Sequence, residues 1–139
     1  MNLLHRATLE ENLEGMHLIT ESIQPDQLSG IVNDHEDTDG WTPLLWAVQR
    51  GNLEAVQFLI DKGASVDATK GDKMGALHIA ASNNDIHTID YLTKLQVFPT
   101  VDIQNEEGWT PAHLAGFLNN FDSLNLLIER GSDICIKHS

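Results

Sequence analysis

The sequence predicts an all-α protein, a solenoid of four helix-turn-helix units, and two observations support the prediction. The residues GWTPLLWA at 40–47 return as GWTPAHLA at 108–115, with a degenerate copy, KMGALHIA, between them at 73–80. The copies are 33 and 35 residues apart, a spacing typical of helical repeat proteins. After each copy, apolar residues recur three to four apart and form one face, which has only neighbouring units to pack against.

The repeated motif resembles the ankyrin repeat family, whose signature is Thr-Pro-Leu-His-x-Ala. The resemblance covers nearly the whole chain, with two strong copies, the degenerate copy and an end copy that lacks its hairpin. It implies an ankyrin-repeat solenoid in which short β-hairpins or turns connect the helix pairs. We expect one ankyrin-repeat domain over 1–139, with units at about 1–35, 36–68, 69–103 and 104–139.

The first unit matches the second at an offset of 40 residues. We expect helices at 2–11, which Asn2 can cap, and at 13–22. The residues QPDQLSG at 24–30 lengthen the connection that follows, and Pro25 and Gly30 predict a loop there. End repeats are commonly atypical because they have a neighbour on one side only.

Each helix boundary of the second unit has a physical cause. Thr42 can accept hydrogen bonds from the first free amides, and Pro43 at the first helical position loses no intrahelical bond. Asn52 can cap the outer helix, expected at 53–62, and Gly63 supplies the left-handed residue that ends it. The unit is therefore predicted to be helix, turn, helix.

The third unit keeps the apolar positions but has Gly75-Ala76 in place of Thr-Pro. It loses both the cap and the preset backbone angle, so we expect its inner helix to fray most. The stretch 95–100 is two residues longer than its counterpart and contains Pro99, which rules out a continued helix. We expect this insert to bulge on the outer side.

The fourth unit restores Thr110-Pro111 and ends its outer helix at Arg130-Gly131. A C-terminal capping repeat would be polar on its outward side, yet this unit stays apolar. The residues that keep it apolar are Phe117, Leu118, Phe121 and Leu126. We therefore expect the chain to be the N-terminal part of a longer protein or a trimmed piece of one.

The composition indicates a folded protein of the cell interior. The chain has 41% hydrophobic and 21% charged residues, no apolar run of membrane-spanning length and no signal peptide. The single cysteine, Cys135, excludes an internal disulfide, and no Asn-x-Ser/Thr acceptor occurs. We expect an intracellular, cytoplasmic location.

The charge pattern narrows the class of partner. The chain carries 21 acidic and 8 basic residues, for a formal net charge of −13 at pH 7. This charge repels phosphate backbones and anionic lipids, so we expect no nucleic acid and no direct membrane binding. It attracts basic partners, although the same charge also serves solubility alone.

The candidate catalytic and metal-binding residues do not match any site of known spacing. His78 and His113 occupy the histidine position of the motif, and His5 fills the same place by its offset. There the ankyrin resemblance implies hydrogen bonds to backbone groups of the adjacent hairpin. The remaining histidines lack zinc-ligand spacing and are His17, His35, His87 and His138. We expect no enzyme, no catalytic residue, no cofactor and no metal.

The residues DTDG at 37–40 resemble the middle of a calcium-binding loop. Placing Gly40 at loop position 6 puts His35 at position 1 and Trp46 at position 12, where calcium needs an aspartate and a bidentate glutamate. We therefore interpret the stretch as a hairpin tip between units.

In ankyrin arrays the hairpin tips and the exposed side of the inner helices form a concave groove, and the resemblance implies partner-binding positions one by one. At the tips these are Thr38, Asp39, Trp41, Asp72, Met74, Glu106, Glu107 and Trp109. On the inner helices they are Gln49, Arg50, Ser82, Asn83, Phe117 and Leu118. Acidic residues alternate there with large apolar ones, which are typical interface anchors.

The tryptophans leave two interpretations open. Trp41 and Trp109 are either exposed anchors for a partner or partly packed members of the hairpin core, and a mixed role combines both. Trp46 is predicted to belong to the core, because Ile79 and Leu114 fill its place in the later units.

The sequence favours a non-catalytic protein–protein interaction module, monomeric as an isolated domain, that binds a basic or amphipathic protein segment in its groove. A second hypothesis makes it the N-terminal regulatory or substrate-recruiting domain of a larger enzyme or channel that extends beyond Ser139. A third makes it a purely structural scaffold.

Overall fold

The computed structural model of the chain describes residues 3–34, 40–95 and 101–131. Within these ranges the chain forms helices and no strand, apart from an isolated bridge between Thr69 and Gly75. The helices of the repeat form pairs, which are α1 (Leu3–Leu9) and α2 (Leu13–Glu21), α4 (Pro43–Arg50) and α5 (Leu53–Asp61), α6 (Ala76–Ser82) and α7 (Ile86–Thr93), and α8 (Pro111–Phe117) and α9 (Phe121–Glu129). This is the predicted all-α solenoid.

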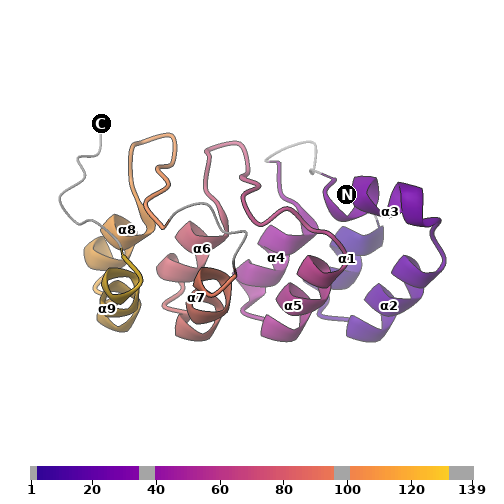
Figure 1. The fold of residues 1–139 in the computed structure, drawn as a ribbon, viewed down its shortest axis with the longest axis horizontal. Helices are drawn as coiled ribbons and strands as arrows, with labels where there is room; N and C mark the ends of the chain where they lie inside the picture. Colours follow the sequence, from indigo (N-terminus) through magenta and orange to yellow (C-terminus); the bar gives the residue numbers. More distant parts are fainter. Residues whose placement is uncertain (1–2, 35–39, 96–100, 132–139) are drawn as a thin grey trace.

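The helix pairs stack in a row, and the described segments that precede α6 and α8 rise along one edge of it (Figure 1). The inner helices α1, α4, α6 and α8 contact one another in that order. The outer helices α2, α5, α7 and α9 each pack on the inner helix of their own pair. The core therefore runs along the row.

Local capping sets the helix ends that the sequence predicts. Thr42 Oγ1 accepts a hydrogen bond from the Leu45 amide at 3.2 Å, with Pro43 at the start of α4. Asn52 Oδ1 accepts one from the Ala55 amide at 3.2 Å and caps α5. Gly63 follows α5 with a φ of 99°, in the left-handed region that glycine adopts without strain.

The loop expected at 24–30 is wrong, because Pro25–Val32 forms a helix, α3. A proline is tolerated in the first turn of a helix, where its missing N–H would have no partner. Val32 is fully buried, and Leu28 and Ile31 pack against the core. This burial outweighs the roughly 1 kcal/mol that Gly30 costs inside a helix.

The inner helix of the third pair, α6, begins after Gly75 without a side-chain cap. The His78 ring compensates in part, since its Nδ1 accepts a hydrogen bond from the Gly75 amide at 3.3 Å. Greater fraying of α6 stays a prediction. The insert expected to bulge lies almost wholly at 96–100, outside the described residues.

The core repeats from pair to pair. Leu44 and Leu77, at matching positions of α4 and α6, are each 1% exposed. On the outer helices, Leu59, Leu92 and Leu127 are all fully buried. Burying one such side chain contributes about 1.5–3 kcal/mol, and each is buried by the adjoining helices. No helix in the described part of the chain is long and apolar enough to cross a membrane.

Candidate functional site: the hairpin edge and the inner helices

Two hairpins bring the expected tip residues into register. The Lys70 amide donates to the Met74 carbonyl at 3.1 Å, and the Asn105 amide donates to the Trp109 carbonyl at 2.9 Å. The tips also touch, because the Glu106 amide donates to the Asp72 carbonyl at 2.9 Å. Backbone bonds within and between the hairpins therefore fix the places of Met74 and Trp109.

Buried histidines tie the inner helices to these hairpins, as the resemblance implies. His5 Nε2 lies 2.9 Å from the Trp41 carbonyl, and His78 Nε2 lies 2.8 Å from the Trp109 carbonyl. Because His78 Nδ1 accepts a bond from Gly75, Nε2 carries the proton and donates. Burial lowers the pKa of His78 below its usual value, although the Trp109 carbonyl and nearby Asp72 act in the opposite direction. His78 is thus a neutral structural residue.

Trp41 is partly exposed and partly packed on the core, and its role as a partner anchor stays a prediction. Its ring stacks on Trp46 with a centroid distance of 4.2 Å and an interplanar angle of 15°. The Lys70 ammonium lies 5.1 Å from the Trp41 ring centroid, within reach of a cation–π contact. Sequence reasoning missed Lys70, because its contact with Trp41 crosses from one unit to the next.

The prediction that Trp46 belongs to the core is wrong, because its side chain is only half-buried. The indole is larger than Ile79, which fills the same place and is 3% exposed, so it extends beyond the core and onto Trp41. Its Nε1 is buried and, among the described residues, is the one such side-chain atom without a hydrogen-bond partner. No feature of the repeat pattern predicts this stack of the two rings.

Trp109 is also partly exposed, and its ring meets that of Phe117 edge to face at 5.4 Å. Phe117 lies at the end of α8 and is 72% exposed. In the first hairpin, Met74 packs on the core, and its sulfur lies 3.2 Å from Asn105 Nδ2 of the second hairpin. We call Trp41, Trp46, Met74, Trp109 and Phe117 the apolar row.

The charges at the tips are mixed. Asp72 pairs with Lys70 at 2.8 Å. Burial acts to raise the pKa of Asp72, but the bond from Lys70, the Met74 amide and the lysine charge outweigh burial and lower it. Glu106 and Glu107 are exposed, and no ion pair joins them to another described residue. Free negative charge is therefore found at the Trp109 hairpin.

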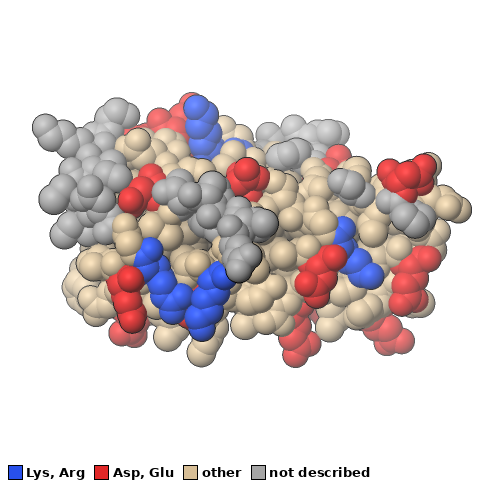
Figure 2. Space-filling model, viewed as in Figure 1, with Lys and Arg blue, Asp and Glu red and all other residues tan. Residues whose placement is uncertain are grey.

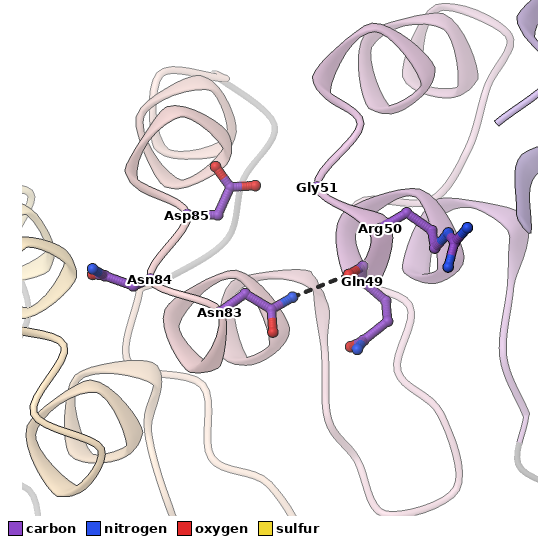
Figure 3. A pocket seen from close by; sticks show the side chains of 6 residues that line it. All are labelled: Gln49, Arg50, Gly51, Asn83, Asn84 and Asp85. Atoms are coloured by element: carbon purple, nitrogen blue, oxygen red, sulfur yellow. Dashed lines mark hydrogen bonds between the residues drawn. The ribbon is translucent and has the colours of Figure 1, made fainter.

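A second group of expected residues lies at the other end of the inner helices. Gln49, Arg50 and Asn83 line a polar depression of about 510 Å³, together with Gly51, Asn84 and Asp85. Asn83 Nδ2 donates to the Gln49 backbone carbonyl at 3.2 Å and joins the two units (Figure 3). The side chains of Arg50, Asn84 and Asp85 point in different directions, so they do not converge on a ligand (Figure 3).

Most of the expected site residues therefore lie either at the hairpins, as Met74 and Trp109 do, or at the far ends of the inner helices, where the polar depression is. Phe117 is also at a helix end, but its ring reaches back to Trp109. An inner helix such as Pro43–Arg50 lies between the two groups, about 12 Å long at 1.5 Å per residue. Leu118 is 45% exposed beside Phe117, and Ser82 is half-buried. Thr38 and Asp39 lie outside the described residues, as does the DTDG tip of the calcium interpretation except Gly40.

The outer face differs from the hairpin edge. Lysine and arginine atoms gather over α7 and α9, whereas acidic atoms are spread along the whole stack of helix pairs (Figure 2). There Asp90 pairs with Lys94 at 3.0 Å and with Arg130 at 2.5 Å. The Arg130 contact joins two units, whereas the Lys94 contact lies within the third unit. In the described ranges, no three His, Cys, Asp or Glu side chains gather as metal ligands.

The fold and the site together define a helical repeat protein whose conspicuous surface is a row of side chains on the hairpin edge. The family description of ankyrin repeats in many copies matches residues 3–60 and 45–93, and that of the ankyrin repeat matches 107–139. The chain belongs to the ankyrin repeat family. Ankyrin repeat domains are non-catalytic, and they are generally protein–protein interaction modules.

The chain is similar to pieces of much longer proteins. It is 31% identical over 95% of its length to the human transient receptor potential cation channel subfamily A member 1, and spans 11% of that protein. It is 29% identical over 96% of its length to the chicken nuclear factor NF-kappa-B p105 subunit. It is 31% identical over 76% of its length to the NAD-dependent deacetylase sir2B of Dictyostelium discoideum. It spans 14% of each of these two relatives.

Proposed function

We propose that the chain binds a basic or amphipathic segment of another protein along its apolar row, as a rigid module without chemistry of its own. The exposure of Phe117 beside Trp109 supports this proposal most directly, because an aromatic pair open to water is a typical interface anchor. A depression of about 410 Å³ adjoins the pair. An apolar side chain of the partner fits there.

The partner's charge follows from the carboxylates at the same hairpin. Glu106 and Glu107 precede Trp109 and are exposed. They attract a basic segment from a distance and suppress acidic ones, while burial of the apolar row supplies most of the affinity. The chain's net charge of −13 acts in the same direction. Lys70 stays over Trp41 and restricts the preference for basic groups to the Trp109 end.

The test uses two labelled peptides of equal length with apolar residues at helical spacing, one with lysine and one with glutamate at the remaining positions. Fluorescence anisotropy should show binding of the lysine peptide only, weakened by added salt. Phe117→Ser, which introduces the residue found at Ser82, should weaken binding by about tenfold or more. Leu18→Ser, at a side chain 63% exposed on α2, is the matched control.

Equal binding of both peptides, or equal affinity of the Phe117→Ser and Leu18→Ser variants, contradicts the proposal. Glu106→Gln with Glu107→Gln tests the charge separately. This variant should lower the affinity for the lysine peptide and reduce its salt dependence. If affinity persists at full strength, the partner is chosen by apolar contacts alone, and the preference for a basic segment is wrong.

A second candidate function is that of a regulatory or recruiting domain within a larger channel or enzyme. It is favoured by the relatives, which include a cation channel and a deacetylase of which this chain matches only 11% and 14%. A native transcript with a stop codon directly after Ser139 would contradict it. We also propose a cytoplasmic location, which the single cysteine favours, and a monomeric isolated domain, which the high net charge favours.

A further inference from the structure

Lys70 is a charged residue whose side chain is largely covered. The side chain is 16% exposed, although lysines are mostly exposed in folded proteins. Lys73, in the same hairpin, is exposed. The backbone holds Lys70 in place, because its amide donates to the Met74 carbonyl at 3.1 Å and its carbonyl accepts from the Lys73 amide at 2.8 Å. The difference between the two lysines therefore lies in what the Lys70 side chain contacts.

The Lys70 ammonium has two partners of different kinds. It lies 5.1 Å from the centroid of the Trp41 ring and 2.8 Å from Asp72 Oδ2. The other carboxylate oxygen, Asp72 Oδ1, accepts a hydrogen bond from the Met74 amide at 3.1 Å, which fixes the carboxylate. An aromatic face beside a carboxylate is a favourable site for a primary ammonium group. Trp41 and Asp72 thus form a cation site, and Lys70 fills it.

The cation site is held together by contacts that do not involve the lysine side chain. The Trp41 ring stacks on Trp46 at a centroid distance of 4.2 Å. Gly40, with a φ of 77°, brings the chain before Trp41 close to the next hairpin, since a Cβ added there would lie 3.2 Å from the Gly71 nitrogen. The ring and the carboxylate should therefore keep their places when the lysine side chain is removed.

The repeat itself does not require a lysine at this position. Asn105 takes the matching place in the next hairpin, where its amide donates to the Trp109 carbonyl at 2.9 Å. Asn105 Nδ2 lies 3.2 Å from the Met74 sulfur, so it also contacts the apolar row of the preceding unit. Both residues make this backward contact, but at Trp41 the contacting group is charged. The charge of Lys70 is therefore a property of this one position.

We propose that Lys70 is a specificity-determining residue that acts as an internal ligand. It fills the cation site of Trp41 and Asp72, so that the apolar row accepts basic side chains of a partner at the Trp109 hairpin and only uncharged ones beside Trp41. The partner segment is then basic toward one end and apolar toward the other. The cation site stands on the contacts above, whereas its consequence for a partner rests on the proposed function.

The cation site is tested first without a partner. Lys70→Ala should leave a space for n-butylammonium, which has the four-carbon chain and the ammonium of a lysine side chain. At equal ionic strength, n-butylammonium should raise the urea midpoint of Lys70→Ala and shift its Trp41 indole signal, and n-butanol should do neither. Lys73→Ala removes the same charge at an exposed place, so it should respond as the wild type does. Equal responses of the two variants would overturn the cation site.

The wild-type chain supplies a measurement that does not depend on the folding of a variant. Protons over an aromatic face are shielded by its ring current, so the ε-methylene protons of Lys70 should resonate upfield of those of Lys73. Asp72→Asn should reduce this difference, because the carboxylate no longer holds the ammonium. Equal shifts of the two lysines in the wild type would show that Lys70 does not occupy the site and would overturn the proposal.

The consequence for a partner is tested with the lysine peptide and two half-peptides, in which glutamine replaces lysine in one half or the other. The wild type should bind the lysine peptide and the better half-peptide with affinities within about twofold, because only the Trp109 hairpin takes basic groups. Lys70→Ala should bind the lysine peptide about fivefold more tightly than that half-peptide. Lys73→Ala should keep the wild-type ratio.

Adding Asp72→Asn to Lys70→Ala should cancel the fivefold preference, because the carboxylate of the vacated site is then lost. A ratio in Lys70→Ala equal to that in Lys73→Ala would overturn the specificity role. If none of the peptides binds any variant, the proposed function and the specificity role both fail, while the n-butylammonium response decides the cation site alone.

Discussion

His78→Leu removes the side chain that joins α6 to the next hairpin and to its own first turn. The substitution is informative because the second unit has a leucine, Leu45, at this place, and that leucine is fully buried. The second unit tolerates leucine because Thr42 caps α4, whereas Gly75 offers α6 no side-chain cap. The same residue should therefore be harmful in one unit and harmless in the other.

The magnitude follows from the groups that lose a partner. The Trp109 carbonyl keeps the Asn105 amide at 2.9 Å, so only its second bond is lost. The buried Gly75 amide loses its bond to the ring, and an unpaired buried donor costs about 1–3 kcal/mol. Leucine recovers part of this by its greater hydrophobicity. We expect a net loss of about 2 kcal/mol in the free energy of unfolding.

Urea unfolding followed by far-ultraviolet circular dichroism measures this loss. With a slope of roughly 2 kcal/mol/M, the midpoint of His78→Leu should fall by about 1 M. Leu45→His, the reverse exchange in the second unit, is the matched comparison and should gain no stability. A midpoint of His78→Leu equal to that of the wild type would refute the role given to the ring.

Three other outcomes follow from the same structure. Gly75→Thr should raise stability by about 1 kcal/mol in urea unfolding, because Gly75 has extended N-cap geometry (φ −102°) and its added Cβ meets only ordinary contacts, the nearest at 3.5 Å. Gly30→Ala should raise the free energy of unfolding by about 0.5–1 kcal/mol, because alanine is the better helix former and nothing lies within 4 Å of the added methyl. A lower free energy of unfolding would contradict the helix at 25–32 and indicate a loop there. Lowering the pH from about 7 to 5 should reduce the free energy of unfolding, because burial lowers the pKa of His78 and the unfolded chain therefore binds the proton first. In His78→Leu, the free energy of unfolding should depend less steeply on pH over the same range.

The fold is predictable from the sequence wherever a local interaction decides the structure. The caps at Thr42 and Asn52 depend on amides three residues away, and Gly63 depends on its own backbone angle. The helix Pro25–Val32 was missed because its turn residues are local signals, while the burial of Val32 that stabilises it is a tertiary contact. Distant contacts can override such signals without leaving a periodic pattern.

The candidate site is predictable only in part, for a similar reason. The motif identified His5 and His78 as ties to the hairpins, and both bond to tryptophan carbonyls. The stack of Trp46 on Trp41 and the Lys70 ammonium over it join a helix to two hairpins, and repeat spacing carries no information on ring orientation. The separation of polar and apolar site residues likewise required the positions of whole helices.

The most direct test of the binding proposal is to follow backbone and indole NMR signals of the labelled chain during titration with the lysine peptide. Peak shifts should concentrate at Met74, Glu107, Trp109 and Phe117 along the hairpin edge. The amide signals of α5 and α7, on the outer face, should not shift. Shifts confined to the outer helices, or none at saturating peptide, would contradict a binding surface on the apolar row.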